Sequence, residues 1–397
     1  MDDLERLEEA FSSGTLLRPA GRIPTIVDLA HVLVQLANGA APRKNAHEQA
    51  LAKLIAPSDH LVFILADGVG STLLKQLPPK SFLRTHVRET LQTVFPSSTA
   101  PALTSLATGL WPSQHAITGW WTHLPQLNDA ATILPYVDRA ASKTLRGRID
   151  PADAFPKPST QGRIKRDYRG FFPGEIAHTT YSDYATANQP RSGYRGLQDA
   201  VNQVIARIRT AKGPTYTYLY IPDVDEAEHH FGTGDCLPVL KQVNDELVRL
   251  SQATRTRARL ILTADHGFKD PPAKAKFRLK PTPELNDLLS CPPSGDARVL
   301  YFHALPRAEA RLRAYLNAVW GDAFVLLTAA QVQALHLFGP GPLTAETRRR
   351  IGTHVALSLG ASVAEYTTGP TAGRLLEQRS HHSGLTPDEL LVPLVIA

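Results

Sequence analysis

The sequence predicts an α/β fold in which a mostly parallel sheet carries helices on both faces and a cap is inserted late in the chain. Two observations predict this fold. Short apolar runs rich in strand-forming residues alternate with helical stretches, a pattern typical of parallel sheets buried on both faces. Three of these runs are followed within two residues by an acidic residue, and ligands bind at the carboxyl ends of the strands in such sheets.

Residue type and periodicity place the individual elements. A short helix and a loop are expected within residues 1–22. Apolar residues at helical spacing then predict helices over 24–55 (interrupted by a loop near 38–43), 71–77, 102–109, 198–211 and 237–253. Uninterrupted apolar runs rich in β-branched and aromatic residues predict strands over 61–66, 215–221, 259–264, 298–304 and 392–396.

Two stretches interrupt this alternation. Residues 125–197 are rich in Pro, Gly, Arg and Tyr and show little periodicity. Residues 268–355 begin with a polar, proline-rich stretch and have a helix–strand alternation of their own. We therefore expect a catalytic α/β domain made of residues 1–267 and 356–397, with residues 268–355 inserted as a cap subdomain.

The amino-acid composition bears on the partners and the cellular location that we expect for this chain. Lys and Arg outnumber Asp and Glu by 43 to 37 with no obvious single patch and no basic motif interleaved with aromatic residues, so we expect no nucleic-acid partner. The mild positive charge favours anionic small molecules such as phosphate esters. The acidic start of the chain is unlike a signal peptide, and no apolar run reaches membrane-spanning length. Cys236 and Cys291 are not at metal-ligand spacing, so we expect reduced thiols in a cytoplasmic protein with no membrane partner.

Four groups of residues carry the chemistry. Asp67 ends the first strand, and FPSST at 95–99 supplies three hydroxyl groups before a predicted helix, whose free N–H groups favour an anion. The remaining segments are DVDEAEHHFG at 223–232, TADHG at 263–267 and HHSGL at 381–385. Because three of the acidic groups follow predicted strands, we expect them to meet at one edge of the sheet.

These residue types point to metal-assisted chemistry. Carboxylates and imidazoles without thiolates suit zinc or a similar divalent metal. Two such ions stabilise the attacking and leaving oxygens of an in-line displacement, and a hydroxyl beside a metal becomes a good nucleophile. Each motif alone is weak, since an Asp after a strand is often a helix cap and FPSST alone is more often a capped helix start. Their order along the chain favours a two-metal hydrolase.

In this order the motifs resemble those of the alkaline phosphatase superfamily, most closely its nucleotide pyrophosphatase/phosphodiesterase branch and the related phosphonoacetate hydrolases. The match runs from Asp67 to the C-terminus. The resemblance implies an alkaline-phosphatase-like fold, with Thr99 of the F-P-x-x-T segment as the catalytic nucleophile. It also implies two metal ions, one held by Asp67, Thr99, Asp265 and His266, and the other by Asp225, His229 and His382.

Some positions depart from the family's pattern. Diesterases of the family often carry an asparagine three residues after the nucleophile, where it helps to hold the phosphoryl oxygen, and this position is Ala102 here. The backbone N–H groups near Thr99 and Ala100 are alternative donors. Ser383 replaces the first glycine after the late histidine. Rival residues also stand one position from three of the assigned ones, namely Ser98, His230 and His381.

The sequence says less about the substrate. Trp120, Trp121 and Tyr181 either line a pocket for a flat group or pack loops against the core. Arg379, beside the late histidines, either binds phosphate or lies on the surface.

The leading expectation is a phosphoric ester hydrolase. It would cleave phosphodiester or pyrophosphate bonds of small, nucleotide-like substrates through a phospho-threonine intermediate, using two divalent ions, Zn²⁺ or Mn²⁺. A phosphomonoesterase, a phosphonate hydrolase or a phosphomutase of the same superfamily stays open. The alternative from another class is a non-catalytic metal- or nucleotide-binding module.

Overall fold

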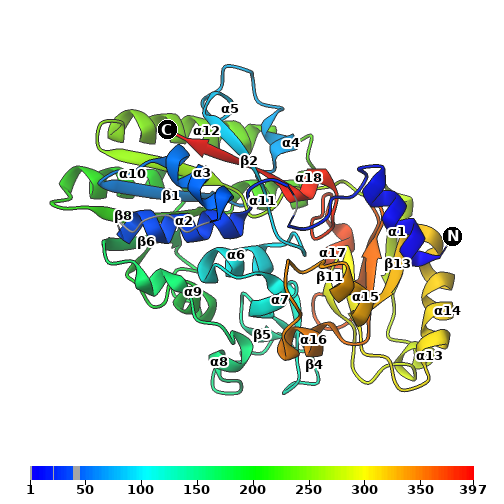
Figure 1. The fold of residues 1–397 in the computed structure, drawn as a ribbon. Coiled ribbons are helices and arrows are strands. Elements are labelled where there is room, and N and C mark those ends of the chain that lie inside the picture. Colours follow the sequence, from blue (N-terminus) through cyan, green and yellow to red (C-terminus); the bar gives the residue numbers. More distant parts are fainter. Residues whose placement is uncertain (1, 21, 39–44) are drawn as a thin grey trace.

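The computed structural model describes residues 2–20, 22–38 and 45–397, and its strands form two large sheets and one small one. The large sheets lie toward opposite ends of the molecule in the view of Figure 1. The loop predicted near residues 38–43 falls almost wholly outside the described residues. The fold is the predicted α/β fold, with a mostly parallel central sheet between helices.

The central sheet has seven strands, of which five consecutive neighbours run parallel. In spatial order they are β2 (Val87–Gln92), β16 (Leu391–Ile396), β9 (Ala258–Thr263), β1 (His60–Ala66), β8 (Thr215–Ile221), β6 (Asp167–Pro173) and β7 (Arg191–Tyr194). β16 runs antiparallel to both of its neighbours. The strand predicted over 392–396 is therefore present, but with the opposite direction to the parallel set.

Strand register brings the acidic turns to one edge. Ala66 at the end of β1 pairs with Ile221 at the end of β8, and Leu65 pairs with Thr263 at the end of β9. The chain leaves these three strands at the same level, so the residues that follow them lie close together, as the sequence predicts.

Helices cover both faces of the central sheet, with α2, α3 and α6 on one side and α10 and α12 on the other (Figure 1). Their apolar faces and the strands form one continuous core. The principal helices are α1 (Asp3–Ser12), α2 (Ile26–Asn38), α3 (Ala46–Ile55), α6 (Thr99–Thr108), α9 (Thr180–Ala185), α10 (Leu197–Thr210), α11 (Asp223–Phe231), α12 (Leu237–Thr254), α14 (Glu309–Trp320), α15 (Ala329–Ala334) and α16 (Ala345–Ile351). Short helical turns are α4 (Ser71–Leu74), α5 (Phe82–Thr85), α7 (Pro112–His115), α8 (Pro151–Ala154), α13 (Pro283–Asn286), α17 (Arg374–Glu377) and α18 (Pro387–Leu390). No helix among the described residues is both long and apolar enough to cross a bilayer.

The second large sheet draws on two separate parts of the chain. Its order is β13 (Phe324–Thr328), β14 (His354–Ser358), β12 (Val299–Phe302), β11 (Ser294–Asp296), β3 (Trp121–Leu124), β4 (Asp129–Thr132) and β5 (Val137–Asp138). A two-stranded sheet joins β10 (Lys276–Leu279) to β15 (Val363–Tyr366). Residues 268–355 thus do not form the second sheet alone, and the division into a catalytic domain and a cap at these boundaries stays a prediction.

Two features of the strands go beyond what the sequence predicts. The strand predicted at 298–304 is present as β12, and it pairs antiparallel in the second sheet, because a short apolar run does not reveal which sheet it joins. Residues 125–197, which lack visible periodicity, supply four strands and two of them belong to the central sheet. In DYRGFFP at 167–173, glycine and a terminal proline mask the strand signal.

A buried ion pair joins the second sheet to the loop before β16. Arg298 Nε lies 2.7 Å from Glu389 Oε1, and both side chains are fully buried. Glu389 also accepts hydrogen bonds from the N–H of Gly384 and from the backbone and hydroxyl of Thr386. One carboxylate therefore holds both Arg298 and the turn that follows the late histidines.

Removing the Glu389 carboxylate should strongly destabilise the folded protein. We expect Glu389→Ala to lower the free energy of unfolding by about 3–5 kcal/mol, because it leaves the Arg298 charge buried without a partner. Urea denaturation followed by circular dichroism measures this loss. Glu246→Ala, which breaks the part-exposed pair with Arg249, is the matched control and should cost less than about 1 kcal/mol. Equal losses in the two variants would contradict a structural role for the buried pair.

Candidate metal centre

Two clusters of metal-ligand side chains lie at the carboxyl edge of the central sheet. The first contains Asp67, Asp265 and His266, all buried. His266 Nε2 lies 3.4 Å from Asp67 Oδ1 and 3.4 Å from Asp265 Oδ2. β1 and β9 position these residues directly, since Asp67 follows the last residue of β1 and Asp265 comes two residues after β9.

The second cluster contains Asp225, His229 and His382. Asp225 and His229 are four residues apart on α11, so they face the same side of that helix. Asp225 Oδ1 lies 3.7 Å from His229 Nε2 and 4.0 Å from His382 Nε2. His266 Nε2 is 3.9 Å from the same oxygen, which places the two clusters side by side.

Unpartnered atoms in these clusters fit a metal. Asp67 Oδ1, Asp225 Oδ1 and Asp265 Oδ2 are buried and have no hydrogen-bond partner among the described residues. The other oxygens of Asp67 and Asp265 do accept hydrogen bonds, from the Tyr220 hydroxyl and from the N–H groups of Gly68 and His266. A buried carboxylate oxygen without a partner is energetically unfavourable, and a divalent cation would remove that penalty.

Thr99 lies beside the first cluster, whereas Ser98 is turned away. Thr99 begins α6, and its Oγ1 is 3.1 Å from His266 Nε2. The Ser98 hydroxyl donates to Asp296 Oδ2 at 2.6 Å, in the second sheet. The geometry thus favours Thr99 over its neighbour.

In each pair of adjacent histidines, only one side chain belongs to the clusters. His230 is exposed and bonds through Nδ1 to the Glu226 carbonyl of its own helix. His381 is buried, but its backbone bridges to Lys269 and its side chain lies outside the two clusters. All seven residues predicted as ligands therefore come together in the two predicted groups, and their roles as ligands stay a prediction.

Two backbone positions make this arrangement possible. Gly68 has φ +77°, and a Cβ there would lie 2.8 Å from the Phe268 ring and 3.0 Å from Asp225 Cα. Ser383, where the family's pattern has glycine, has φ 94°. Its hydroxyl accepts a hydrogen bond from the Arg298 N–H and its own N–H donates to the Ser97 carbonyl, which hold this unfavourable conformation.

Several supporting residues were missed by the sequence analysis. Tyr220 donates its hydroxyl to Asp67, and His229 Nδ1 lies 2.9 Å from the Ser380 carbonyl, which orients the ring. Glu228 is fully buried on α11 with both carboxylate oxygens unpartnered among the described residues. The alternation in TYTYLYI hints at Tyr220, but these partners depend on packing between distant segments.

Two cavities open on either side of Thr99. One, of about 460 Å³, is lined mainly by apolar and aromatic side chains, including Phe63, Leu106, Phe172, Tyr181 and Tyr218. The other, of about 470 Å³, is lined by more polar residues, including Trp121, Arg374, Gln378 and His381. Thr99, Trp120, Pro135 and Asp225 line both cavities. Of the residues left open by the sequence, Trp120, Trp121 and Tyr181 thus line cavities, whereas Arg379 is exposed and lines neither.

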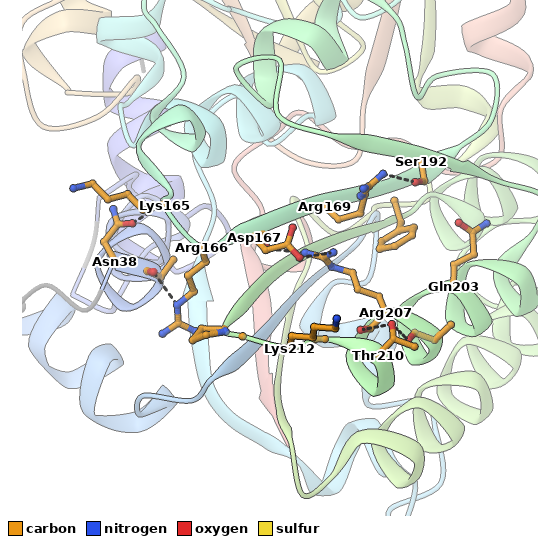
Figure 2. A pocket seen from close by; sticks show the side chains of 16 residues that line it. Asn38, Lys165, Arg166, Asp167, Arg169, Ser192, Gln203, Arg207, Thr210 and Lys212 are labelled. Atoms are coloured by element: carbon orange, nitrogen blue, oxygen red, sulfur yellow. Dashed lines mark hydrogen bonds and ion pairs between the residues drawn. The ribbon is translucent and has the colours of Figure 1, made fainter.

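A larger groove of about 950 Å³ lies elsewhere, near the amino ends of β6 and β8 (Figure 2). It gathers basic side chains from two separate parts of the chain, namely Lys165, Arg166, Arg169, Arg207 and Lys212. Arg207 pairs with Asp167, and Arg166 donates to backbone carbonyls that include those of Ala37 and Ser58. None of the seven predicted ligands is among its described lining residues, so this groove is not the candidate metal centre.

A comparison with models of known protein families identifies the family of this chain. The profile described as "Type I phosphodiesterase / nucleotide pyrophosphatase" matches residues 61–322, which is well over half of the chain. The chain belongs to this family. It is accordingly an enzyme of the phosphoric ester hydrolase class. A comparison with curated protein sequences gives no match.

Solved structures support the fold of this family member. Human ectonucleotide pyrophosphatase/phosphodiesterase 5 superposes with a TM-score of 0.63 at 16% identity, over 85% of this chain and 87% of that one. An inactive variant of the murine protein, solved in complex with AMP, gives 0.62 at 16% identity over 84% and 87%. Phosphonoacetate hydrolase from Sinorhizobium meliloti 1021, solved with phosphonoformate, gives 0.55 at 18% identity over 84% and 89%.

The environment of this centre favours the neutral form of its histidines, which can bind a metal, and disfavours the charged form of its carboxylates. Burial lowers the pKa of His266 to about 3 and that of His229 to about 4, so both rings are neutral at physiological pH. Burial raises the pKa of Asp265 to about 7 and, together with neighbouring carboxylates, raises the pKa of Asp67 and Asp225 well above the ordinary value. Positive ions would offset this repulsion.

We expect the carboxylates of this centre to destabilise the metal-free protein as pH rises from about 4 to about 8, in opposition to the buried histidines, whose lowered pKa values favour the folded state as pH rises. A carboxyl group with a raised pKa binds more protons in the folded state, so its contribution is present below the unfolded pKa and is lost as pH rises through the folded value, about 7 for Asp265. Bound ions replace those protons, so the metal-loaded protein should not show this loss. Calorimetric Tm across this pH range, with and without chelator, measures the difference.

The control for this experiment is Asp265→Asn, which should reduce the loss of stability near pH 7 in the chelated protein because the amide does not titrate in this range. The same pH dependence in chelated and metal-loaded protein would contradict the assignment of these carboxylates to a metal centre.

Proposed function

We propose that this enzyme hydrolyses phosphodiester or pyrophosphate bonds of nucleotide-like substrates through a phospho-threonine intermediate on Thr99. The observation that carries the proposal is that two cavities meet at Thr99 and Asp225. A diester or pyrophosphate has a group on each side of the reacting phosphorus, and the two cavities offer a separate space for each. A monoester would fill only one of them.

The chemical character of the cavities supports a nucleotide-like substrate. Tyr181, Phe172 and Tyr218 give the apolar cavity flat faces on which an aromatic base can stack. Arg374 and Gln378 give the other cavity donors for a second phosphate or a polar leaving group. The murine relative whose inactive variant was solved with AMP offers a precedent for such a ligand.

Two divalent ions, Zn²⁺ or Mn²⁺, fit the two ligand clusters, one at Asp67, Asp265, His266 and Thr99 and the other at Asp225, His229 and His382. When bound, they would lower the pKa of a nearby hydroxyl and neutralise charge that develops on the phosphoryl oxygens.

The chain itself supplies the nucleophile and its positioning. Thr99 at the start of α6 points its hydroxyl toward the first cluster, so it can attack phosphorus in line. Pro101 has no N–H and the Ala102 N–H bonds to the Ser98 carbonyl, which leaves the N–H groups of Thr99 and Ala100 as phosphoryl-oxygen donors in this turn. This arrangement compensates for the absence of an asparagine at Ala102.

We expect Thr99→Ala to reduce turnover of bis-p-nitrophenyl phosphate by about three orders of magnitude or more, since the nucleophile is lost while the fold and the other three ligands of the first metal are kept. Thr99→Ser should retain substantial activity because it keeps the hydroxyl. Ser98→Ala is the matched control and should be mild, because that hydroxyl is committed to Asp296.

The stereochemical outcome at phosphorus distinguishes between Thr99 as the nucleophile and Thr99 as a positioning residue. Attack by Thr99 followed by attack of water gives two inversions, hence overall retention at phosphorus in a chiral phosphorothioate substrate. Overall inversion would show direct attack by water and reduce Thr99 to a positioning residue.

The shape of the site predicts a preference among substrates. The Zn²⁺- or Mn²⁺-loaded enzyme should show a kcat/KM for bis-p-nitrophenyl phosphate about 10-fold or more above that for p-nitrophenyl phosphate, because burying a second aryl group contributes about 1.5–3 kcal/mol. Trp120→Ala should reduce this ratio, since Trp120 lines both cavities, and Trp121→Ala, which alters one cavity only, should reduce it less. A higher kcat/KM for the monoester would favour the phosphomonoesterase alternative.

A further inference from the structure

A third cluster of metal-ligand side chains lies in the second sheet, apart from the candidate metal centre. It contains His123 on β3, Cys291 between α13 and β11, and His303 directly after β12, and one donor atom of each lies within 4.8 Å of the others. Cys291 Sγ is 3.8 Å from His123 Nδ1, and the centroids of the two imidazole rings are 4.3 Å apart. It shares no residue with the two clusters around Thr99.

Backbone pairing holds the three residues together. Gly295 of β11 pairs with Trp121 of β3, and Leu289 bridges to Ala304 beside His303. The Ser290 N–H donates to the His303 carbonyl at 2.9 Å. The segment that carries Cys291 is thus fixed between the strands that carry the two histidines.

One atom of this cluster lacks a partner. His303 Nε2 is buried and has no hydrogen-bond partner among the described residues. An unpaired buried nitrogen costs about 1–3 kcal/mol. A hydrogen bond between the Cys291 thiol and His123 would satisfy those two groups but leave His303 Nε2 unpaired, whereas a metal ion would engage all three.

The charges around the cluster are compatible with a cation. Burial lowers the pKa of His123 to about 3 and also lowers that of His303, so both imidazoles are neutral and able to act as ligands. Burial raises the pKa of the Cys291 thiol to about 11, and a bound metal would displace its proton. The nearby guanidinium groups of Arg139 and Arg350 are each paired with a carboxylate, that of Asp129 and that of Glu346.

We propose that His123, Cys291 and His303 bind a zinc ion, with water at the fourth position, as a site separate from the catalytic metals. Two imidazoles and a thiolate suit zinc and exclude magnesium, calcium and manganese as preferred ions. Ligand atoms around a tetrahedral zinc lie roughly 3.3–3.7 Å apart, so the pair at 3.8 Å nearly fits, and the third donor, within 4.8 Å of the other two, has to approach by at most about 1.5 Å. The ion would cross-link β3, β12 and the Cys291 segment.

Cobalt substitution tests the site directly. Chelated full-length protein loaded with Co²⁺ should show a near-ultraviolet thiolate-to-cobalt charge-transfer band, because only a cysteine ligand gives this band and the two clusters around Thr99 contain none. Added Zn²⁺ should abolish it. Cys291→Ser should lose the band and one metal ion per chain while turnover of bis-p-nitrophenyl phosphate is unchanged. His303→Asn should weaken Co²⁺ binding at this site about 10-fold or more.

Two controls separate this proposal from the proposed function. Cys236→Ser should keep the band, since Cys236 is buried in the core of the central sheet at the start of α12 and is not part of this cluster. Asp225→Ala should keep the band even though activity is lost. A wild-type protein without the band, a band that survives Cys291→Ser, or one that disappears with Cys236→Ser would overturn the proposal.

Discussion

Repulsion among three carboxylates, two of them buried and one half-buried, is the constraint on which the rest of this structure depends. Asp67, Asp225 and Asp265 converge at the carboxyl edge of the central sheet, each with an unpartnered oxygen directed at a neighbouring imidazole. Burial and mutual repulsion raise the pKa of all three. A protein gains nothing in stability from such a cluster by itself. The arrangement fits a cation-binding site. Without bound cations, the repulsion among these carboxylates lowers the stability of the protein.

The surroundings hold this unfavourable cluster in place through contacts with the second sheet. Ser98 bonds to Asp296, Ser97 bonds to the Gly384 carbonyl, and the Arg298–Glu389 pair fixes the turn after His382. The Ser97–Thr99 segment and the late histidines are therefore both held from the side of the second sheet. This sheet is part of the support of the site as well as a wall of its cavities.

The two cavities that could select the substrate both border Thr99. Trp120 stands where they meet, and its backbone N–H donates to Asp296, the same residue that orients Ser98. The wall between the cavities and the turn that carries Thr99 thus share one anchor. A change at Asp296 in the second sheet would therefore alter both the shape of the cavities and the position of Thr99.

The sequence by itself determined the local parts of this protein. Apolar runs fixed β1, β8, β9 and β16, and the acidic residues after three of these strands indicated the edge where they meet, because parallel strand ends share one edge. The spacing of Asp225 and His229 on one helix face was equally readable. Only the tertiary structure shows which of two adjacent side chains lies in the clusters, Thr99 and not Ser98, His229 and not His230, and His382 and not His381, because this depends on where a side chain points. It also decided the composition of the second sheet and the meeting of His123, Cys291 and His303, since pairing between distant segments leaves no periodic signal in the chain.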